Sequence, residues 1–109
     1  SKFKKSEILS LHNDFFWDRS RKKLFYNEEE VKLTKKEIKL ISLLSDEPDQ
    51  FFSSDDIAVT LWDFDEINEQ SNQKVIQIVY RLKTKISKLT SSDFHIIDNV
   101  YGSGYKIKV

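Results

Sequence analysis

The chain contains two glycines, Gly102 and Gly104, which lie two positions apart in the C-terminal segment VYGSGYKIKV. Closely spaced glycines can form a loop that binds phosphate, but such a loop leads directly into a helix whose N-terminus supplies further donors. Here the following residues, Tyr105 to Val109, alternate strictly between apolar and polar types, which is typical of a β-strand. The preceding residues 94–100 are rich in β-branched and aromatic side chains. We therefore expect a β-hairpin rather than a phosphate loop, with the glycines supplying positive φ angles in its turn.

Two groups of acidic residues have spacings that could suit a metal ion. Asp55 and Asp56 follow a pair of serines, and first-turn acids that stabilise a helix dipole explain them with fewer assumptions than a metal site. The second group lies in the segment DFDEINEQ, residues 63–70. Its carboxylates are Asp63, Asp65, Glu66 and Glu69. Calcium binding does not fit this segment, because it lacks the glycine that calcium loops use for their tight turn.

Few groups in the chain are suited to catalysis. The two histidines, His12 and His95, lie near a turn and in a strand pattern, where a structural or surface role explains them better. There is no Gly-x-Ser-x-Gly motif and no cluster of metal ligands. The chain also has no cysteine, which excludes disulfides and thiolate metal sites. We therefore expect neither an enzyme nor a bound cofactor.

The composition is that of a single globular domain. Hydrophobic residues make up 39% and charged residues 33% of the 109 positions, which is ordinary for a folded soluble chain. No run of about 18 apolar residues is present, so we expect no membrane span. The chain contains no methionine. It therefore lacks a start residue, and we expect it to be a fragment of a longer protein or a processed form.

The charges are unevenly distributed along the chain. The formal net charge is zero, which by itself argues against strong nucleic-acid binding. However, residues 34–70 hold three basic and ten acidic side chains, whereas residues 71–109 hold seven and two. Between Gln70 and Ser92 there are five basic residues and no acid. This asymmetry indicates an anionic partner for one face of the domain.

The secondary structure that would position these residues can be predicted from local sequence patterns. Residues 1–7 form a polar, basic linker end, and the domain occupies residues 8–109. From Ile8 to Lys32, short apolar groups alternate with charged clusters, which predicts three or four short antiparallel strands. We expect their turns at residues 13–14, 18–21 and 27–28.

Two capping boxes then predict helices. In TKKE, Thr34 is the N-cap and Glu37 reaches back to it, apolar residues follow at helical spacing, and Pro48 lies just past the end. In SSDD, Ser53 is the N-cap and Asp56 stands three residues later.

A third helix is predicted over residues 71–89, with Ser71 as its N-cap. Its apolar stripe contains Val75, Ile78, Val79, Leu82, Ile86 and Leu89. The opposite face contains Gln73, Lys74, Gln77, Tyr80, Arg81, Thr84 and Lys88. A solvated surface would explain such a face in an arbitrary helix. This one is basic with no balancing acid, and its Gln, Arg and Tyr side chains can hydrogen-bond base edges or phosphates.

The order of these elements resembles a known family. The segments VKLTKKEIKLISLL, FFSSDDIAVTLW, VIQIVYRLKTKI and IIDNVYGSGYKI are similar to the OmpR/PhoB-type effector domain of bacterial two-component response regulators. The resemblance spans roughly residues 8–109. It implies an α+β fold, a winged helix-turn-helix with a small N-terminal antiparallel sheet, three helices and a C-terminal β-hairpin wing. It also implies that the third helix enters the major groove of DNA and that the wing reaches the adjacent minor groove.

The resemblance implies specific DNA contacts. On the third helix they are Gln73, Lys74, Gln77, Tyr80, Arg81 and Thr84, to which we add Lys88 from the same face. Phosphate contacts near the second helix correspond to Ser54 and Trp62, and the hairpin contributes Asn99 and Tyr101.

Further partners follow from the same resemblance. The segment 63–70 matches the loop through which relatives contact RNA polymerase, although a solvated acidic connector explains it equally well. Family members usually have an N-terminal receiver domain, phosphorylated on Asp, and bind tandem DNA sites as head-to-tail dimers. The resemblance therefore implies double-stranded DNA, RNA polymerase and a receiver domain as partners, no membrane partner, and a cytoplasmic location.

Several positions depart from the family pattern. Relatives often have Arg at the position of Gln73, Asp and His at those of Ile76 and Ile78, and Arg at that of Tyr101. These departures support an alternative function, a winged helix that binds protein through Tyr80, Tyr101, Ile76 and the acidic loop, with weak or no DNA binding. A DNA affinity that falls steeply with salt would favour the first function, and salt-insensitive or absent binding would favour the alternative.

Overall fold

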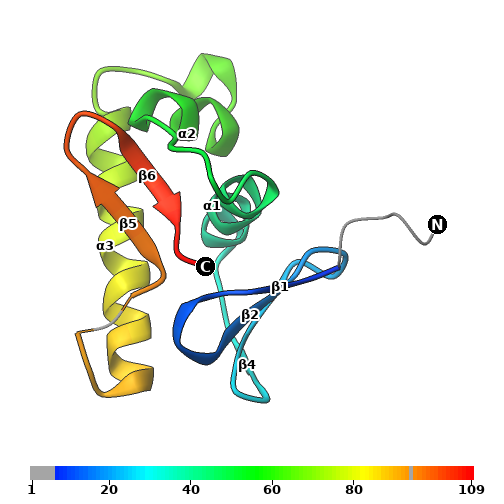
Figure 1. Cartoon of the computed structure of the whole chain (residues 1–109). Coiled ribbons are helices and arrows are strands. Elements are labelled where there is room, and N and C mark those ends of the chain that lie inside the picture. Colours follow the sequence, from blue (N-terminus) through cyan, green and yellow to red (C-terminus); the bar gives the residue numbers. More distant parts are fainter. Residues whose placement is uncertain (1–6, 94) are drawn as a thin grey trace.

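The computed structural model describes residues 7–93 and 95–109. The elements in chain order are β1 (Ile8–Ser10), β2 (Phe15–Asp18), β3 (Lys23–Tyr26), β4 (Glu29–Val31), α1 (Lys35–Asp46), α2 (Ser54–Leu61), α3 (Ser71–Thr90), β5 (Ile97–Val100) and β6 (Gly104–Ile107), with short 3-10 turns at His12–Asp14 and Phe64–Glu66 (Figure 1). The predicted α+β winged-helix architecture is confirmed. The linker end predicted for residues 1–7 lies, apart from Glu7, outside the described residues.

The N-terminal strands form one antiparallel sheet in the order β1-β2-β3-β4. Four strands are therefore present, in agreement with the alternation of apolar and charged groups. Phe15, Trp17 and Leu24 point from one face of the sheet into the core and are fully or almost fully buried. Asn13 and Asn27 have positive φ angles of 62° and 55° in the connecting turns, which asparagine tolerates better than most residues.

Both predicted capping boxes are present. The Thr34 hydroxyl accepts a hydrogen bond from the Glu37 N–H at 3.2 Å, and the Glu37 carboxylate accepts from the Thr34 N–H at 2.9 Å. Ser53 and Asp56 make the same reciprocal pair at the start of α2. Each pair satisfies two backbone donors that a helix N-terminus otherwise leaves without partners.

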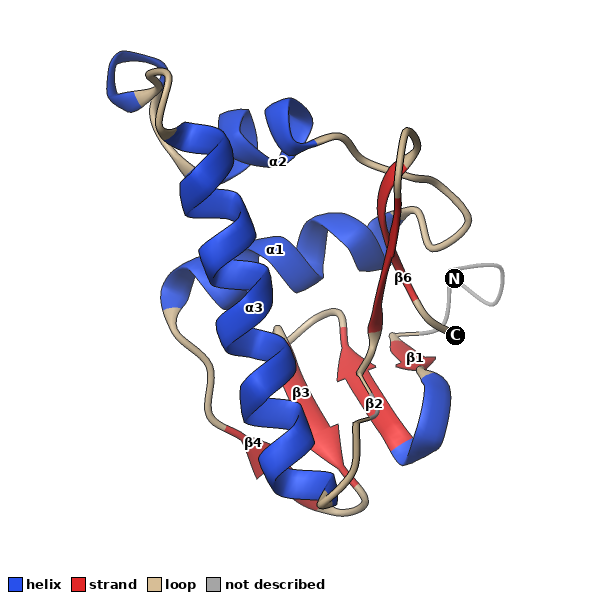
Figure 2. Cartoon of the chain, turned by 90° about the vertical axis from the view of Figure 1, so that its left-hand side faces the viewer, coloured by secondary structure: helices blue, strands red, loops and turns tan. Residues whose placement is uncertain are grey.

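The ends of α3 differ from the prediction. Gln70, not Ser71, is the N-cap, and Ser71 is the first helical residue, whose buried hydroxyl accepts a hydrogen bond from the Asn68 N–H at 3.0 Å. A contact to the preceding loop thus replaces the expected cap. At the other end Leu89 is 46% exposed rather than buried, because the last turn lies at the margin of the domain, beside Phe16 of the sheet (Figure 2).

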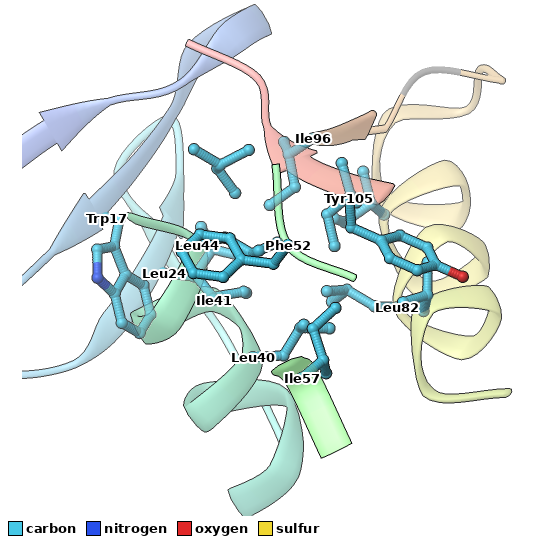
Figure 3. Packing of buried hydrophobic residues seen from close by; sticks show 14 of the residues in the cluster. Trp17, Leu24, Leu40, Ile41, Leu44, Phe52, Ile57, Leu82, Ile96 and Tyr105 are labelled. Atoms are coloured by element: carbon cyan, nitrogen blue, oxygen red, sulfur yellow. The ribbon is translucent and has the colours of Figure 1, made fainter. Parts of the chain in front are cut away.

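One hydrophobic core joins the sheet, the helices and the hairpin (Figure 3). Its labelled members from the sheet and the helices are Trp17, Leu24, Leu40, Ile41, Leu44, Ile57 and Leu82. Phe52 comes from the α1–α2 connection, Ile96 from the segment before β5, and Tyr105 from β6. The rest of the buried row of α3 is Val75, Val79 and Ile86. Because this row faces inward, the opposite side of α3 faces solvent.

The hairpin forms as predicted, with one refinement at the start of β5. Gly102 and Gly104 have φ angles of +83° and +113°, which confirms that they supply positive φ. Strand β5 begins at Ile97, later than the 94–100 pattern suggests, since Ile96 is buried in the core outside the strand. Phe94, the first residue of that pattern, lies outside the described residues.

A third strand-like segment pairs with the hairpin. Phe52 and Tyr105 exchange two backbone hydrogen bonds, each 2.8 Å long. The backbone of Phe52 therefore lies directly beside Gly104, where a Cβ atom would stand 2.3 Å from the Phe52 carbonyl oxygen. Gly104 is required both for its φ angle and for this close approach.

The two glycines give a direct test of this packing. We expect Gly104→Ala to lower the free energy of unfolding by about 3 kcal/mol or more, because it adds a backbone clash to an unfavourable φ. Gly102→Ala is the matched control, since no atom lies within 4 Å of its added Cβ, and it should cost only about 1 kcal/mol. Urea unfolding of both variants measures the difference. Equal losses would show that φ alone selects glycine at both positions.

Candidate nucleic-acid interface

The outward face of α3 contains most of the predicted DNA-contact residues, and the structure shows how exposed each of them is. Helices α2 and α3 pack together, and α3 lies beside the hairpin on the face turned toward the viewer in Figure 2. Of the predicted set, Gln73, Gln77, Tyr80, Arg81 and Lys88 are exposed, and Lys74 and Thr84 are partly buried. The periodicity therefore assigned this face of the helix correctly.

Trp62 lies at the end of α2 against the N-terminal half of α3. Its ring is partly buried, with the Lys74 ammonium 5.9 Å from the ring centroid and the Lys36 ammonium 5.4 Å from it. Both distances are within the range of cation–π attraction. These three side chains bring α1, α2 and α3 together at one point of the surface.

Two grooves flank Arg81. The first has a volume of about 350 Å³ and is lined by Thr34, Lys36, Trp62, Lys74, Gln77, Ile78 and Arg81. The second, of about 300 Å³, is lined by Tyr80, Arg81, Thr84, Lys85 and Lys88. Arg81 lines both grooves, and their linings contain cations and no carboxylate.

Sequence reasoning missed Lys36. It lies in the first turn of α1, where a positive charge is unfavourable because the helix dipole is also positive there. Lys35 lies in the same turn, so the charge pattern alone did not single out Lys36, and the contact with Trp62 is visible only in the structure.

An ion pair between a buried carboxylate and a partly exposed lysine lies beside the exposed face. The Glu37 side chain is 5% exposed, and the Lys85 ammonium lies 2.6 Å from its carboxylate. Lys85 also donates a hydrogen bond to the Lys32 carbonyl at 3.0 Å. The ammonium group of Lys85 therefore binds within the domain, although the residue lines the second groove.

The wing presents its predicted residues to solvent. Asn99 is exposed, and Tyr101 at the tip is fully exposed. Ser54, the first residue of α2, is partly buried and follows Ser53, whose backbone lies beside Gly104. The tip end of the hairpin, where Gly104 pairs with Val100, is therefore in contact with the start of α2, and the wing tip and α2 lie at the same end of the molecule (Figure 1).

The acidic loop is partly ordered by its own carboxylates. Glu66 accepts a hydrogen bond from the Asp63 N–H at 3.0 Å across the short 3-10 turn. Asp63, Asp65 and Glu69 are exposed. Phe64 in the same turn is 92% exposed, and sequence reasoning overlooked it. A single phenylalanine within a polar segment was the signal.

The remaining titratable groups suggest no other site. Within residues 7–93 and 95–109, no group of three or more histidines and carboxylates could hold a metal ion. Burial lowers the pKa of His95, and the charges of Lys83 and Lys108 lower it further, so its imidazole is neutral near pH 7. Among the helices of the described part, none has the length and apolarity needed to span a membrane.

Comparison with known proteins identifies the family. The family model described as "Transcriptional regulatory protein, C terminal" matches residues 28–107. The transcriptional regulatory protein SrrA of Staphylococcus aureus is 28% identical over 92 residues, which cover 84% of this chain and 37% of SrrA. The chain thus spans little more than a third of that relative's length.

Solved structures agree on the fold. The DNA-binding domain of the response regulator AdeR, crystallised with an intercistronic region, has a TM-score of 0.70 at 22% identity, covering 91% of this chain and 98% of that one. The Klebsiella pneumoniae RstA DNA-binding domain, crystallised with the RstA box, has a TM-score of 0.65 at 18% identity, covering 94% and 98%. The DNA-binding domain of Escherichia coli CadC has a TM-score of 0.72 at 17% identity, covering 97% and 95%.

Because the family model covers most of the chain and the fold agrees, the chain belongs to the family of C-terminal domains of transcriptional regulatory proteins, the OmpR/PhoB-type winged-helix DNA-binding domains.

Proposed function

We propose that the domain binds a specific double-stranded DNA site with α3 in the major groove and the hairpin wing at the adjacent minor groove. The observation that supports this most directly is the outer face of α3, which combines exposed amide and guanidinium groups with two grooves whose linings contain no carboxylate. An α-helix fits the width of the major groove, where its side chains reach base edges.

The residues on this face divide by their chemistry. Gln73, Gln77 and Arg81 have planar groups that can make paired hydrogen bonds to base edges, and Arg prefers guanine. Lys74 and Lys88 are point charges better suited to phosphates. Sequence specificity would therefore come mainly from the first group, and salt-dependent affinity mainly from the second.

The proposal extends to contacts outside α3. Ser54 and Trp62 would touch the sugar-phosphate backbone, and Asn99 and Tyr101 would meet the minor groove. Two domains with this fold were crystallised with DNA, which supports DNA as the partner of these residues.

Partners of the full-length protein belong to the proposal as well. The chain covers 37% of SrrA, and we propose that the parent protein also contains a receiver domain. We further propose that it binds tandem DNA sites as head-to-tail dimers. The acidic loop 63–70 would contact RNA polymerase, with the exposed Phe64 as an apolar point of attachment. Such a regulator would act in the bacterial cytoplasm, where the chromosome is.

The primary experiment is selection of a preferred duplex from a randomised library, followed by titration of the affinity against salt. We expect log K to fall linearly with log salt, because lysine and arginine release counterions from the phosphates. Absent or salt-insensitive binding would instead support a domain that binds protein.

Arg81 and its neighbour Leu82 test the assignment of the two faces of α3. Arg81→Ala should weaken binding to the selected duplex by about 1–3 kcal/mol and leave the stability of the fold unchanged. Leu82→Ala, at a fully buried position, should lower the free energy of unfolding by about 2–5 kcal/mol. Thermal unfolding and DNA titration of both variants give the answer, and exchanged phenotypes would mean that the faces are reversed.

Tyr101 tests the approach of the wing. An arginine at this exposed tip would gain from the negative potential of a narrow A·T-rich minor groove, whereas tyrosine releases no counterion. We expect Tyr101→Arg to tighten binding, most with A·T-rich flanks, and to steepen the slope of log K against log salt by roughly 0.9. Salt titrations on duplexes with A·T and G·C flanks measure this. Parental affinity and slope would show that the wing stays away from DNA.

The acidic loop can be neutralised with little change in shape. Gln at position 66 keeps an acceptor for the Asp63 N–H, so the double variant Asp65→Asn/Glu66→Gln should fold normally. We expect unchanged or slightly higher DNA affinity but weaker transcription activation by the full-length protein. The measurement is transcription in vitro at saturating promoter occupancy, where activation at the parental level would remove the loop from the mechanism.

A further inference from the structure

We infer that Lys36 of α1, together with Trp62 and Lys74, forms a binding site for a phosphate of the DNA backbone. The inference rests on the proposed function, since it assigns the occupant of a groove beside α3. It adds α1 to the interface, a helix to which the sequence patterns gave only a structural role.

The charged residues that line the groove beside Trp62 favour binding of an anion. Its cationic lining residues are Lys36, Lys74 and Arg81, and its other members are neutral. At about 350 Å³ the groove has room for a phosphate group with some of its waters, because one water molecule takes up about 30 Å³. Three cationic residues line this groove without a carboxylate, and an anion bound among them would reduce the repulsion between their charges.

The acid next to Lys36 in the chain is already paired. Glu37 follows Lys36 in the chain, but its carboxylate is buried and bound by Lys85 at 2.6 Å. The charge of Lys36 is therefore not compensated by its neighbour.

The Lys36 side chain is held close to where an anion would bind. Its ammonium lies 5.4 Å from the Trp62 ring centroid and donates to the Leu61 carbonyl at 3.4 Å. An ammonium group has three donors, so a long hydrogen bond to one carbonyl leaves donors for a phosphate. Since the side chain is already partly ordered, binding would cost less side-chain entropy than for a free surface lysine.

The position of the groove favours contact with a backbone phosphate over contact with a base edge. Gln77 and Arg81 belong both to the lining of the groove and to the outer face of α3. With α3 in the major groove, a site beside the helix faces the strand that borders the groove. Contacts of this kind position a protein on DNA and carry no sequence information.

The test compares Lys36→Gln with Lys39→Gln, a matched loss of charge at an exposed position of the same helix outside the groove. Lys36→Gln should make the slope of log K against log salt shallower by about 0.9, which corresponds to about an eightfold loss of affinity at 0.1 M salt relative to 1 M. The loss should be the same on the selected duplex and on a mixed-sequence duplex. Lys36→Arg should keep the parental slope, and Lys39→Gln should leave slope and affinity nearly parental.

The outcomes separate this inference from the proposed function. If Lys36 only caps the end of α2, Lys36→Gln lowers the unfolding midpoint and keeps the salt slope, and the inference is overturned. A parental slope for Lys36→Gln, in a protein whose affinity still depends on salt and on Arg81, also overturns the inference alone. A parent chain that binds neither duplex overturns the proposed function, and the phosphate site with it.

Discussion

The arrangement of the helices depends on one buried carboxylate. Glu37 accepts a hydrogen bond from the Thr34 N–H at the start of α1 and lies 2.6 Å from the Lys85 ammonium of α3. A buried charge without its partners is strongly destabilising, so this geometry admits little variation. Lys85 also reaches the Lys32 carbonyl, which joins α1, α3 and the end of the sheet. The ion pair supports the orientation of α3 that its buried row sets, in which Leu82 faces the core and Arg81 is exposed.

A chain of zero net charge can present a basic surface when its acids lie elsewhere or are paired. Glu37 is paired with Lys85, and Asp98 lies 3.7 Å from Lys108 near the base of the hairpin. Acids are concentrated in residues 34–70, where several cap helices or lie on the loop before α3. Lys36, Lys74 and Arg81 remain together on one side. The local field that DNA would meet is therefore positive, although the sum over the chain is not.

The wing is tied to the same body by a backbone contact. The exchange of hydrogen bonds between Phe52 and Tyr105 places the hairpin beside the segment that leads into α2. Gly104 makes that approach possible, and the buried Tyr105 and Ile107 insert the inner face of the strand into the core. The proposed contacts of α2, α3 and the wing thus belong to elements that share one core, which suits recognition of two adjacent DNA grooves.

The sequence by itself determined what depends on neighbouring residues. The capping boxes at Thr34 and Ser53, a sheet of three or four short strands, the glycine turn and the exposed face of α3 all follow from local spacing and backbone preference. Only the tertiary structure decided which distant groups meet. The Phe52–Tyr105 pairing, the Glu37–Lys85 ion pair and the gathering of Lys36 at Trp62 join segments whose patterns do not refer to each other. The same holds for the exposure of Leu89, since a helical stripe shows which side is apolar but not how far the core extends along it.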